Sequence, residues 1–247
     1  MIHSKKITVV LPAYNAEKTL RRTVEEIPRD IVDEIILGDD FSHDDTVAVA
    51  ESLDLVTLRH DRNRGYGANQ KTCFNEALHR DADVIVMLHP DYQYSPLLVP
   101  AMASMVAVGQ YDIVLGSRVL GRGALRGGMP LYKYVANRAL TAIENVLLDR
   151  KLSEYHTGYR AFSRGALQRI PYSHNSDDFI FDNQILAQAV HLDMEIGELS
   201  CPARYQPDAS SINPRRAAIY GAGVLSTAVQ YRLVAMGLGR SELFPRE

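Results

Sequence analysis

The chain has 247 residues, of which 46% are apolar, enough to bury the core of one α/β domain of ordinary size. Its formal net charge of −3 gives no basic footprint, so nucleic acid is not an expected partner. The two cysteines, Cys73 and Cys201, lack CxxC or His–Cys spacing, which argues against a disulfide framework and a zinc site and indicates a reducing compartment.

A membrane span needs roughly 20 consecutive apolar residues, and no window of the sequence supplies them. The start of the chain also lacks an apolar run with a cleavage site. We therefore expect a cytoplasmic protein that is soluble or at most peripheral at the inner face of the membrane. Segment 215–238 is largely apolar and contains arginines, which suits a helix lying on a membrane surface. It suits equally well a core-packing helix or a contact in a homo-oligomer.

Short apolar runs alternate with helical patterns along the first half of the chain. The strands are predicted at 7–11, 33–37, 55–59, 83–88 and 111–115, and the helices between them at 17–27, 44–53, 68–79 and 95–108. The second half holds a glycine- and arginine-rich loop at 121–128, a mixed polar segment at 153–163, a strand at 195–201, and helices at 131–148, 177–191 and 215–238. This alternation predicts a single α/β domain with a mostly parallel sheet flanked by helices, followed by a C-terminal helix.

Polar residues follow each of the five predicted strands of the first half. They stand at residues 14–15, 39–40, 60–61, 89–91 and 116–118. Ligands of open α/β sheets bind beyond the carboxyl ends of the strands. The clustering therefore predicts a polar binding site at this edge of the sheet, independently of any family.

Two segments at this edge suit a nucleotide. PAYNAE at 12–17 is a strand end, a turn and a helix start, whose backbone amides can hold phosphate or ribose. The same residues also fit an ordinary turn. GDDFSHDDT at 38–46 supplies carboxylates that can accept hydrogen bonds from a base or a ribose hydroxyl. We expect Asp40 to contact the ligand, whereas Asp44 and Asp45 also fit a helix N-cap.

Glycines permit close approach of a ligand in NRGYGA at 63–68. Neither this segment nor GAG at 221–223 matches the GxGxxG pattern of dinucleotide sites. A dehydrogenase or a nucleotidyltransferase is therefore disfavoured.

The sharpest constellation directly follows the predicted strand at 83–88. Strand alternation would place His89, Asp91 and Gln93 on one side of the chain. An imidazole, a carboxylate and an amide oxygen can together hold a divalent metal that bridges a diphosphate. A polar turn started by Pro90 is the alternative interpretation.

Several arginines follow the predicted site, and guanidinium groups match phosphate oxygens well. Most scattered arginines are solvated surface residues. Arg118 ends a predicted strand at the site edge and is therefore the best candidate among them.

Taken together, the motifs resemble glycosyltransferase family 2, with its GT-A fold, and within it the dolichyl-phosphate mannosyltransferase and polyprenyl-phosphate glycosyltransferase branch. The ordered matches are PAYNAE at 12–17, DDFSHDDT at 39–46, NRGYGA at 63–68, HPDYQYSP at 89–96, GSR at 116–118, TGYRAF at 157–162 and, more loosely, PARY at 202–205 with SSI at 210–212. The resemblance spans residues 7 to 212, and the ordered set is far more specific than any single motif.

The resemblance implies roles for individual residues. Nucleotide contacts fall on Pro12, Tyr14, Glu17, Asp39, Asp40 and Gly67. The metal, magnesium or manganese, falls on His89, Asp91 and Gln93, and the acceptor phosphate on Arg118, Arg126 and Arg204. Catalytic roles fall on Asp91 and Arg118, and, for a hydroxyl acceptor, Asp178 and Asp182 are the candidate catalytic bases. Residues 7–120 would form the nucleotide-sugar half and 121–212 the acceptor half, with 213–247 as C-terminal helix and tail.

The implied reaction is inverting transfer of a hexose from a nucleotide sugar, of the GDP-mannose or UDP-glucose type, to a polyprenyl phosphate. The acceptor already carries an anionic oxygen, so no strong general base is required. Two departures stand out. His89 occupies the first aspartate of the branch's DADxQ motif, which removes a negative charge and favours manganese or reduces activity. The C-terminal membrane spans of many such enzymes are missing.

Two alternatives stay open. In a same-fold transferase acting on a sugar hydroxyl or small molecule, Asp178 or Asp182 would be the base, one helical turn apart on one face. Loss of transfer in Arg118→Ala would favour the lipid phosphate, and a more severe loss in Asp178→Asn or Asp182→Asn would favour the hydroxyl. His89 also keeps open a non-catalytic nucleotide-sugar-binding relative.

Overall fold

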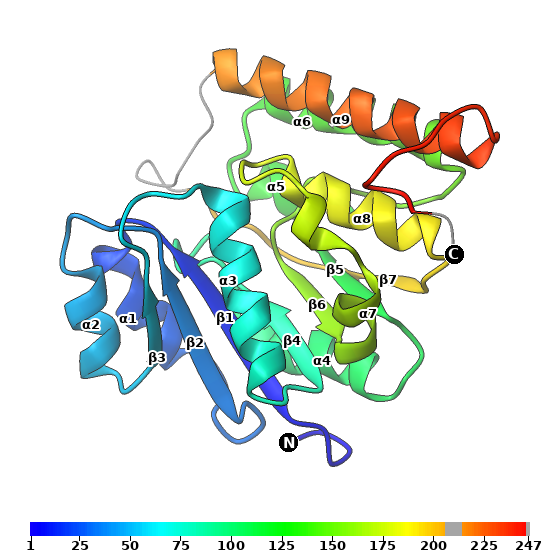
Figure 1. The fold of residues 1–247 in the computed structure, drawn as a ribbon. Helices are drawn as coiled ribbons and strands as arrows, with labels where there is room; N and C mark the ends of the chain where they lie inside the picture. Colours follow the sequence, from blue (N-terminus) through cyan, green and yellow to red (C-terminus); the bar gives the residue numbers. More distant parts are fainter. Residues whose placement is uncertain (206–213, 246–247) are drawn as a thin grey trace.

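The computed structural model describes residues 1–205 and 214–245. A seven-stranded sheet in the order β3-β2-β1-β4-β6-β5-β7 forms its centre, with helices on both faces (Figure 1). The strands are β1 Ile7–Ala13, β2 Glu34–Asp39, β3 Val56–Arg59, β4 Val84–Met87, β5 Ile113–Ser117, β6 Arg160–Ser163 and β7 Ile196–Ser200. All their pairings are parallel except the two made by β6, which runs against both β4 and β5.

The described helices follow the predicted order closely. They are α1 Glu17–Glu25, α2 Thr46–Ser52, α3 Tyr66–His79, α4 Val99–Ala107, α5 Gly123–Arg126, α6 Leu131–Leu148, α7 Arg164–Arg169, α8 Phe181–His191 and α9 Pro214–Ala235, with 3-10 turns at Pro96–Leu98 and Tyr172–His174. The predicted α/β fold with a mostly parallel sheet and a C-terminal helix is confirmed.

Two apolar clusters lie on opposite faces of the sheet. Every residue of β1 is buried, because a central parallel strand is covered on both sides. Ile7, Val9 and Leu11 point into the cluster covered by α1, α2 and α4, whereas Val10 points into the cluster covered by α3 and α8. This alternation fixes the sheet between two helical layers and leaves the carboxyl ends of β1, β2 and β4 as one polar edge.

The structure corrects the sequence prediction in three places. Segment 121–128, expected to be a mobile loop, contains the one-turn helix α5. Segment 153–163, read as mixed and polar, contributes β6. The buried side chain of Arg160 interrupts the apolar pattern of this strand, and its guanidinium is satisfied by the carbonyls of Thr157 and Tyr155 at 2.8 and 3.0 Å. The helix expected from residue 177 begins only at Phe181.

Helices α6 and α9 pack against each other and form an outer layer over α8, at the top of Figure 1. The described part of the chain contains no helix that is both long and apolar enough to cross a bilayer. Helix α9 is nonetheless 22 residues long and remains part of the folded body through its contacts with α6 and α8.

Candidate active site

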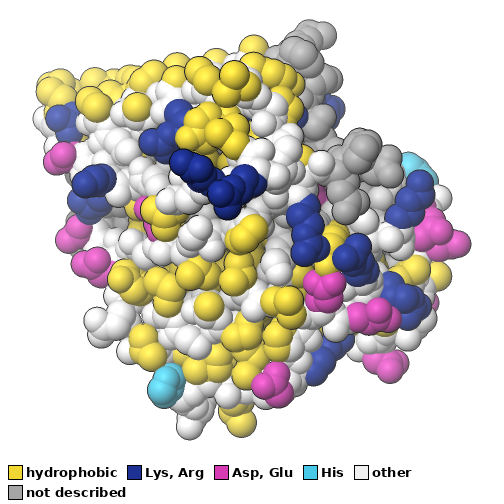
Figure 2. Space-filling view, turned by 180° about the vertical axis from the view of Figure 1, so that it is seen from behind, with side chains coloured by type: hydrophobic (Ala, Val, Ile, Leu, Met, Phe, Trp, Pro, Cys, Tyr) yellow, Lys and Arg dark blue, Asp and Glu magenta, His cyan; other side chains and the backbone are white. Residues whose placement is uncertain are grey.

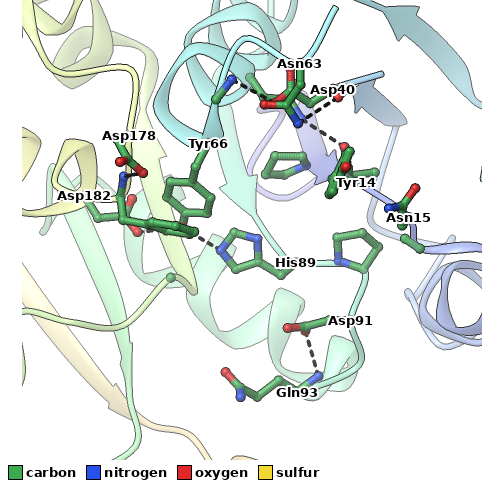
Figure 3. A pocket seen from close by; sticks show the side chains of 18 of the residues that line it. Tyr14, Asn15, Asp40, Asn63, Tyr66, His89, Asp91, Gln93, Asp178 and Asp182 are labelled. Atoms are coloured by element: carbon green, nitrogen blue, oxygen red, sulfur yellow. Dashed lines mark hydrogen bonds between the residues drawn. The ribbon is translucent and has the colours of Figure 1, made fainter. Parts of the chain in front are cut away.

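A pocket of about 1540 Å³ opens at the carboxyl edge of the sheet. Ten of the fourteen predicted site residues line it: Pro12, Tyr14, Glu17, Asp40, His89, Asp91, Gln93, Arg118, Asp178 and Asp182. Several of them are drawn in Figure 3, where they converge from separate elements. The pocket brings together residues from Pro12 to Asp182. Those that follow β1, β2, β4 and β5 meet at the carboxyl edge of the sheet, as polar strand ends in an α/β sheet predict, whereas Asp178 and Asp182 come from the start of α8.

The β1 and β2 ends form one side of the pocket. Tyr14 is 50% exposed, so its ring is available as a flat apolar surface. Asp40 is 4% exposed, and its carboxylate accepts hydrogen bonds from the backbone N–H groups of Arg64 and Gly65 at 2.7 and 2.9 Å. The His60 ring nitrogen lies 2.8 Å from the same carboxylate. Asp40 therefore fixes the loop that follows β3 against the end of β2.

Gly65 explains why this loop can lie so close to the segment before α8. Its φ of +102° is a backbone conformation that favours glycine. A Cβ at this position would lie 2.5 Å from the carbonyl oxygen of Asp177. The loop and the segment before α8 are thus in direct backbone contact.

His89, Asp91 and Gln93 all line the pocket, from the loop after β4 (Figure 3). Strand alternation does not bring them there, because β4 ends at Met87 and Tyr92 has a φ of +57°. The Asp91 carboxylate accepts the Gln93 backbone N–H at 3.0 Å. Among the residues that the structure describes, no three His, Cys, Asp or Glu side chains are grouped to hold a metal on their own. Asp91 and Gln93 supply two oxygen donors, which suits a metal completed by substrate phosphates.

His89 is held by a chain of hydrogen bonds across the pocket. Its Nε2 lies 2.9 Å from the Tyr66 hydroxyl, which donates a hydrogen bond to Asp182 at 2.6 Å. Burial and then the charge of Asp182 raise the pKa of Tyr66 well above its ordinary value, so the phenol stays protonated. An added Cβ at Gly158 would come within 2.4 Å of His89 Nε2, so the ring has little room to turn. Only Nδ1 of His89 is left to face a ligand.

Asp178 and Asp182 both line the pocket, but they differ in environment. They do not lie one turn apart in one helix as predicted, because Asp178 precedes the start of α8. Asp182 is 8% exposed and also accepts a hydrogen bond from Gln70 at 3.0 Å. Asp178 is exposed to solvent. The carboxylate of Asp182 is therefore occupied by protein donors, and Asp178 is the more accessible of the two.

Arg118 reaches the pocket from the end of β5, and a buried carboxylate neutralises its charge. Its guanidinium pairs with Glu154, which is fully buried, and donates to the Tyr205 hydroxyl at 3.0 Å and the His156 carbonyl at 2.7 Å. Burial on its own would raise the pKa of Glu154, but the charge and hydrogen bonds of Arg118 outweigh it, and the pKa is lowered. The sequence analysis assigned Arg118 to an acceptor phosphate and did not predict its pairing with Glu154.

Four predicted site residues lie outside the pocket lining. Asp39 is fully buried and accepts the Ser42 backbone N–H, and the Gly67 N–H donates to the Asp177 carbonyl at 2.8 Å. Arg126 is exposed on α5, and the guanidinium of Arg204 stacks 4.9 Å from the centre of the Tyr92 ring. Asp39 and Gly67 thus hold backbone segments beside the pocket and do not line it. The predicted match at 210–212 lies outside the described residues.

The structure also adds pocket residues that the sequence prediction missed. His156 precedes β6, and Arg216 and Tyr220 come from α9. The Tyr220 hydroxyl lies 2.9 Å from His156 Nδ1, and His156 Nε2 lies 3.2 Å from the buried Glu144 carboxylate of α6. The contact at Glu144 is an ion-pair distance without hydrogen-bond geometry. The sequence signal for two of them is the four-residue spacing of Arg216 and Tyr220, which puts both on one face of α9.

Comparisons with known proteins agree with this geometry. The family model described as "Glycosyl transferase family 2" matches residues 8–171. A Methanococcus voltae protein named UDP-N-acetylglucosamine–dolichyl-phosphate N-acetylglucosaminyltransferase is 26% identical over 81% of this chain and 86% of its own length. The low-salt glycan biosynthesis hexosyltransferase Agl6 of Haloferax volcanii is 30% identical over 84% of this chain, which spans 49% of that longer protein.

Solved structures of glucosyl-3-phosphoglycerate synthase from Mycobacterium tuberculosis share the fold. The complex with UDP gives a TM-score of 0.70 at 20% identity, covering 96% of this chain and 82% of the other. The complex with Mn²⁺, UDP-glucose and glycerol 3-phosphate gives 0.68 at 21% identity, with the same coverage. At this level of identity the likeness demonstrates a shared GT-A-type fold.

Proposed function

The chain belongs to glycosyl transferase family 2 and is a glycosyltransferase, and on this basis we propose that it moves a hexose from a nucleotide sugar to a polyprenyl phosphate with inversion. The observation that carries the proposal is that one pocket joins the three parts such a reaction requires. They are an aromatic and acidic nucleotide side with Tyr14 and Asp40, oxygen donors at Asp91 and Gln93, and an end lined by the arginines Arg118, which pairs with Glu154, and Arg216. Family membership favours this enzyme over a non-catalytic relative.

The donor half, residues 7–120, would bind the nucleotide. The exposed ring of Tyr14 suits stacking on a base, while the loop held by Asp40 borders the ribose side of the pocket. A divalent metal, Mg²⁺ or Mn²⁺, would be held by Asp91 and Gln93 and would neutralise the charge of the departing diphosphate. His89 in place of an acid lowers the negative charge of this donor set and favours Mn²⁺.

The acceptor half, residues 121–212, would deliver the nucleophile. An anionic phosphate oxygen attacks the anomeric carbon on the face opposite the nucleotide, and the bond to the diphosphate oxygen breaks, which inverts the centre. No proton has to be removed from the acceptor, so no free carboxylate base is needed. The occupied state of Asp182 agrees with this: its oxygens already accept from Tyr66 and Gln70. The named activity of the Methanococcus voltae relative, transfer to dolichyl phosphate, supports the same acceptor class.

The second candidate is transfer to a hydroxyl of a sugar or small molecule, and the exposed carboxylate of Asp178 in the pocket favours it. For a lipid-phosphate acceptor, Asp178→Asn should change kcat by less than about threefold, because no base is required. For a hydroxyl acceptor, the same change should lower kcat about 10²- to 10⁴-fold. Rates with short-chain polyprenyl phosphate and with free sugars decide between them. Asp177→Asn is the matched control, since Asp177 lines the pocket and pairs with Lys71 at 2.8 Å.

A thermal-shift panel tests the proposed function most directly. UDP, GDP and their sugars are each added with Mg²⁺, Mn²⁺ or EDTA. We expect one nucleotide family to raise the melting temperature, more strongly with metal, because a ligand that binds only the folded state stabilises it by mass action. Absence of a shift with every nucleotide and metal would contradict the proposal. If EDTA leaves the shift unchanged, nucleotide binding does not depend on a metal, and the metal-dependent part of the proposal is wrong.

A further inference from the structure

The outer layer made by α6 and α9 exposes an unusual number of apolar side chains. Of the 16 large hydrophobic side chains exposed in the described part of the chain, 12 lie within residues 120–146 and 219–238. Val146 and Tyr132 of α6 are 75% and 69% exposed, and Ile219 of α9 is 63% exposed. Figure 2, which views the molecule from behind, shows hydrophobic side chains along most of the upper edge.

Helical spacing places these side chains in stripes rather than at scattered points. On α6, Leu131, Val135 and Val146 recur near the 3.6-residue period, and Arg138 is the single charged residue among the exposed positions of the helix. On α9, Ile219 and Leu233 lie on one such stripe. A surface helix of a globular protein ordinarily carries its charged residues on the outer side. Here the outer sides are apolar, and we call them together the α6/α9 face.

Charge separates this face from the rest of the molecule. Segments 118–148 and 216–240 together contain eight Lys or Arg residues and a single acidic residue, Glu144, which is fully buried. The whole chain contains 27 basic and 30 acidic residues, so the remainder is strongly acidic. Figure 2 shows Lys and Arg side chains directly below the hydrophobic edge. The exposed Asp149 follows α6 directly, so the border of the face is mainly basic. An apolar stripe with a mainly basic border is typical of helices that lie in the headgroup region of anionic membranes.

The face is continuous with the pocket through α9. Arg216 and Tyr220 line the pocket, and Ile219, between them in sequence, belongs to the exposed stripe. Tyr220 is fixed there by His156, at 2.9 Å. A surface on which α9 rests would therefore lie beside the acceptor end of the pocket.

We propose that the α6/α9 face docks on an anionic lipid bilayer, with α6 and α9 lying in the headgroup layer and the acceptor end of the pocket opening toward it. The lengths fit: 18 and 22 helical residues extend about 27 and 33 Å along the surface. A second copy of the chain fits less well, because a two-fold contact would set the basic residues of one face against the same residues of the other. The docking itself does not depend on the proposed function. Only its role, which is to bring the pocket to a lipid acceptor, rests on that function.

Vesicle flotation with the full chain tests the docking alone, using phosphatidylcholine vesicles with and without phosphatidylglycerol and without any polyprenyl phosphate. We expect binding to the anionic vesicles that weakens as salt is raised. Val135→Asp/Val146→Asp should lower the partition coefficient at least about tenfold, because two charges replace apolar groups in the headgroup layer. Both positions are more than half exposed, so the fold should tolerate the change. Leu97→Asp/Val108→Asp is the matched control, with exposed apolar residues beside α4 on the opposite sheet face.

Three results would overturn the docking proposal: no binding of the wild type to anionic vesicles, equal binding by Val135→Asp/Val146→Asp, or a dimer in light scattering that this variant abolishes. Transfer to a water-soluble short-chain polyprenyl phosphate is measured in parallel. A variant that keeps this transfer but no longer floats supports docking as a separate property. Failure of the short-chain transfer in the wild type would count against the proposed function while leaving the flotation result unaffected.

Discussion

Asp91→Ala is expected to lower kcat/KM for sugar transfer on the order of 10³-fold while leaving the fold intact. Asp91 is the carboxylate among the oxygen donors proposed for the metal, and a metal stabilises transition-state charge by several kcal/mol, where about 1.4 kcal/mol corresponds to a factor of ten. Among the described residues, this carboxylate accepts one hydrogen bond, from the Gln93 backbone at 3.0 Å within the same loop. Its removal should therefore cost little stability.

The measurement is a metal titration of initial rates, combined with nucleotide thermal shifts. Asp91→Ala should retain a nucleotide shift in EDTA and lose the additional shift with Mg²⁺ or Mn²⁺. Asp61→Ala is the matched control at the same edge of the sheet, because Asp61 is exposed and its ion pair with Arg64 contributes little. An Asp91→Ala enzyme with wild-type metal dependence would show that the metal, if used, binds elsewhere.

The strand and helix order could be predicted because its signals are local. The β-branched run in β4 and the apolar periodicity of α6 each identify an element without knowledge of its neighbours. Strand β6 was missed because Arg160, a buried cation, has its partners in the turn before β6 and in α8, which no local pattern reveals. The start of α8 was placed too early because Asp177 and Asp178 resemble helix-capping residues but form the turn before the helix.

The candidate site could be predicted in the part where each residue follows its own strand. Tyr14 and Asp40 directly follow β1 and β2, and Asp91 lies in the loop after β4, so the sheet brings the three chain segments to one edge. The part of the pocket near α9 depends on contacts between distant segments, such as Tyr220 with His156 across 64 residues. Neither the position of α9 over the pocket nor the pairing of Arg118 with Glu154 has a signature in one sequence.

The pairing of Arg118 with Glu154 predicts a large effect on stability. Arg118→Met is expected to lower the free energy of unfolding by about 3–5 kcal/mol, because it leaves the Glu154 carboxylate buried without a countercharge. Glu154 is fully buried, and its only other side-chain partner in the described contacts is Asn137 at 2.8 Å. Replacing the partner as well, in Arg118→Met/Glu154→Gln, should restore most of the loss. Urea denaturation of the two variants and the wild type measures both changes.

The same comparison has a defined pH dependence. The folded-state pKa of Glu154 lies below its ordinary value, so the stability that its charge contributes is present above the unfolded-state pKa and is lost as pH falls through the folded one. Arg118→Met/Glu154→Gln lacks this titration. Its stability deficit relative to the wild type should therefore shrink as the solution is acidified. A deficit that stays constant with pH would contradict the pairing.

Loss of transfer in a simple Arg118 variant would not by itself identify a phosphate ligand, because unfolding alone would produce it. The double variant separates the two roles. If the guanidinium contacts the acceptor phosphate, the refolded double variant should still lose about 10- to 100-fold in kcat/KM for the acceptor, the worth of a charge-assisted hydrogen bond of 1.5–3 kcal/mol. Its nucleotide thermal shift should be unchanged. If the double variant transfers sugar at the wild-type rate, Arg118 supports the pocket wall through Glu154, and the acceptor phosphate must be held by other cations, of which Arg216 lines the same pocket.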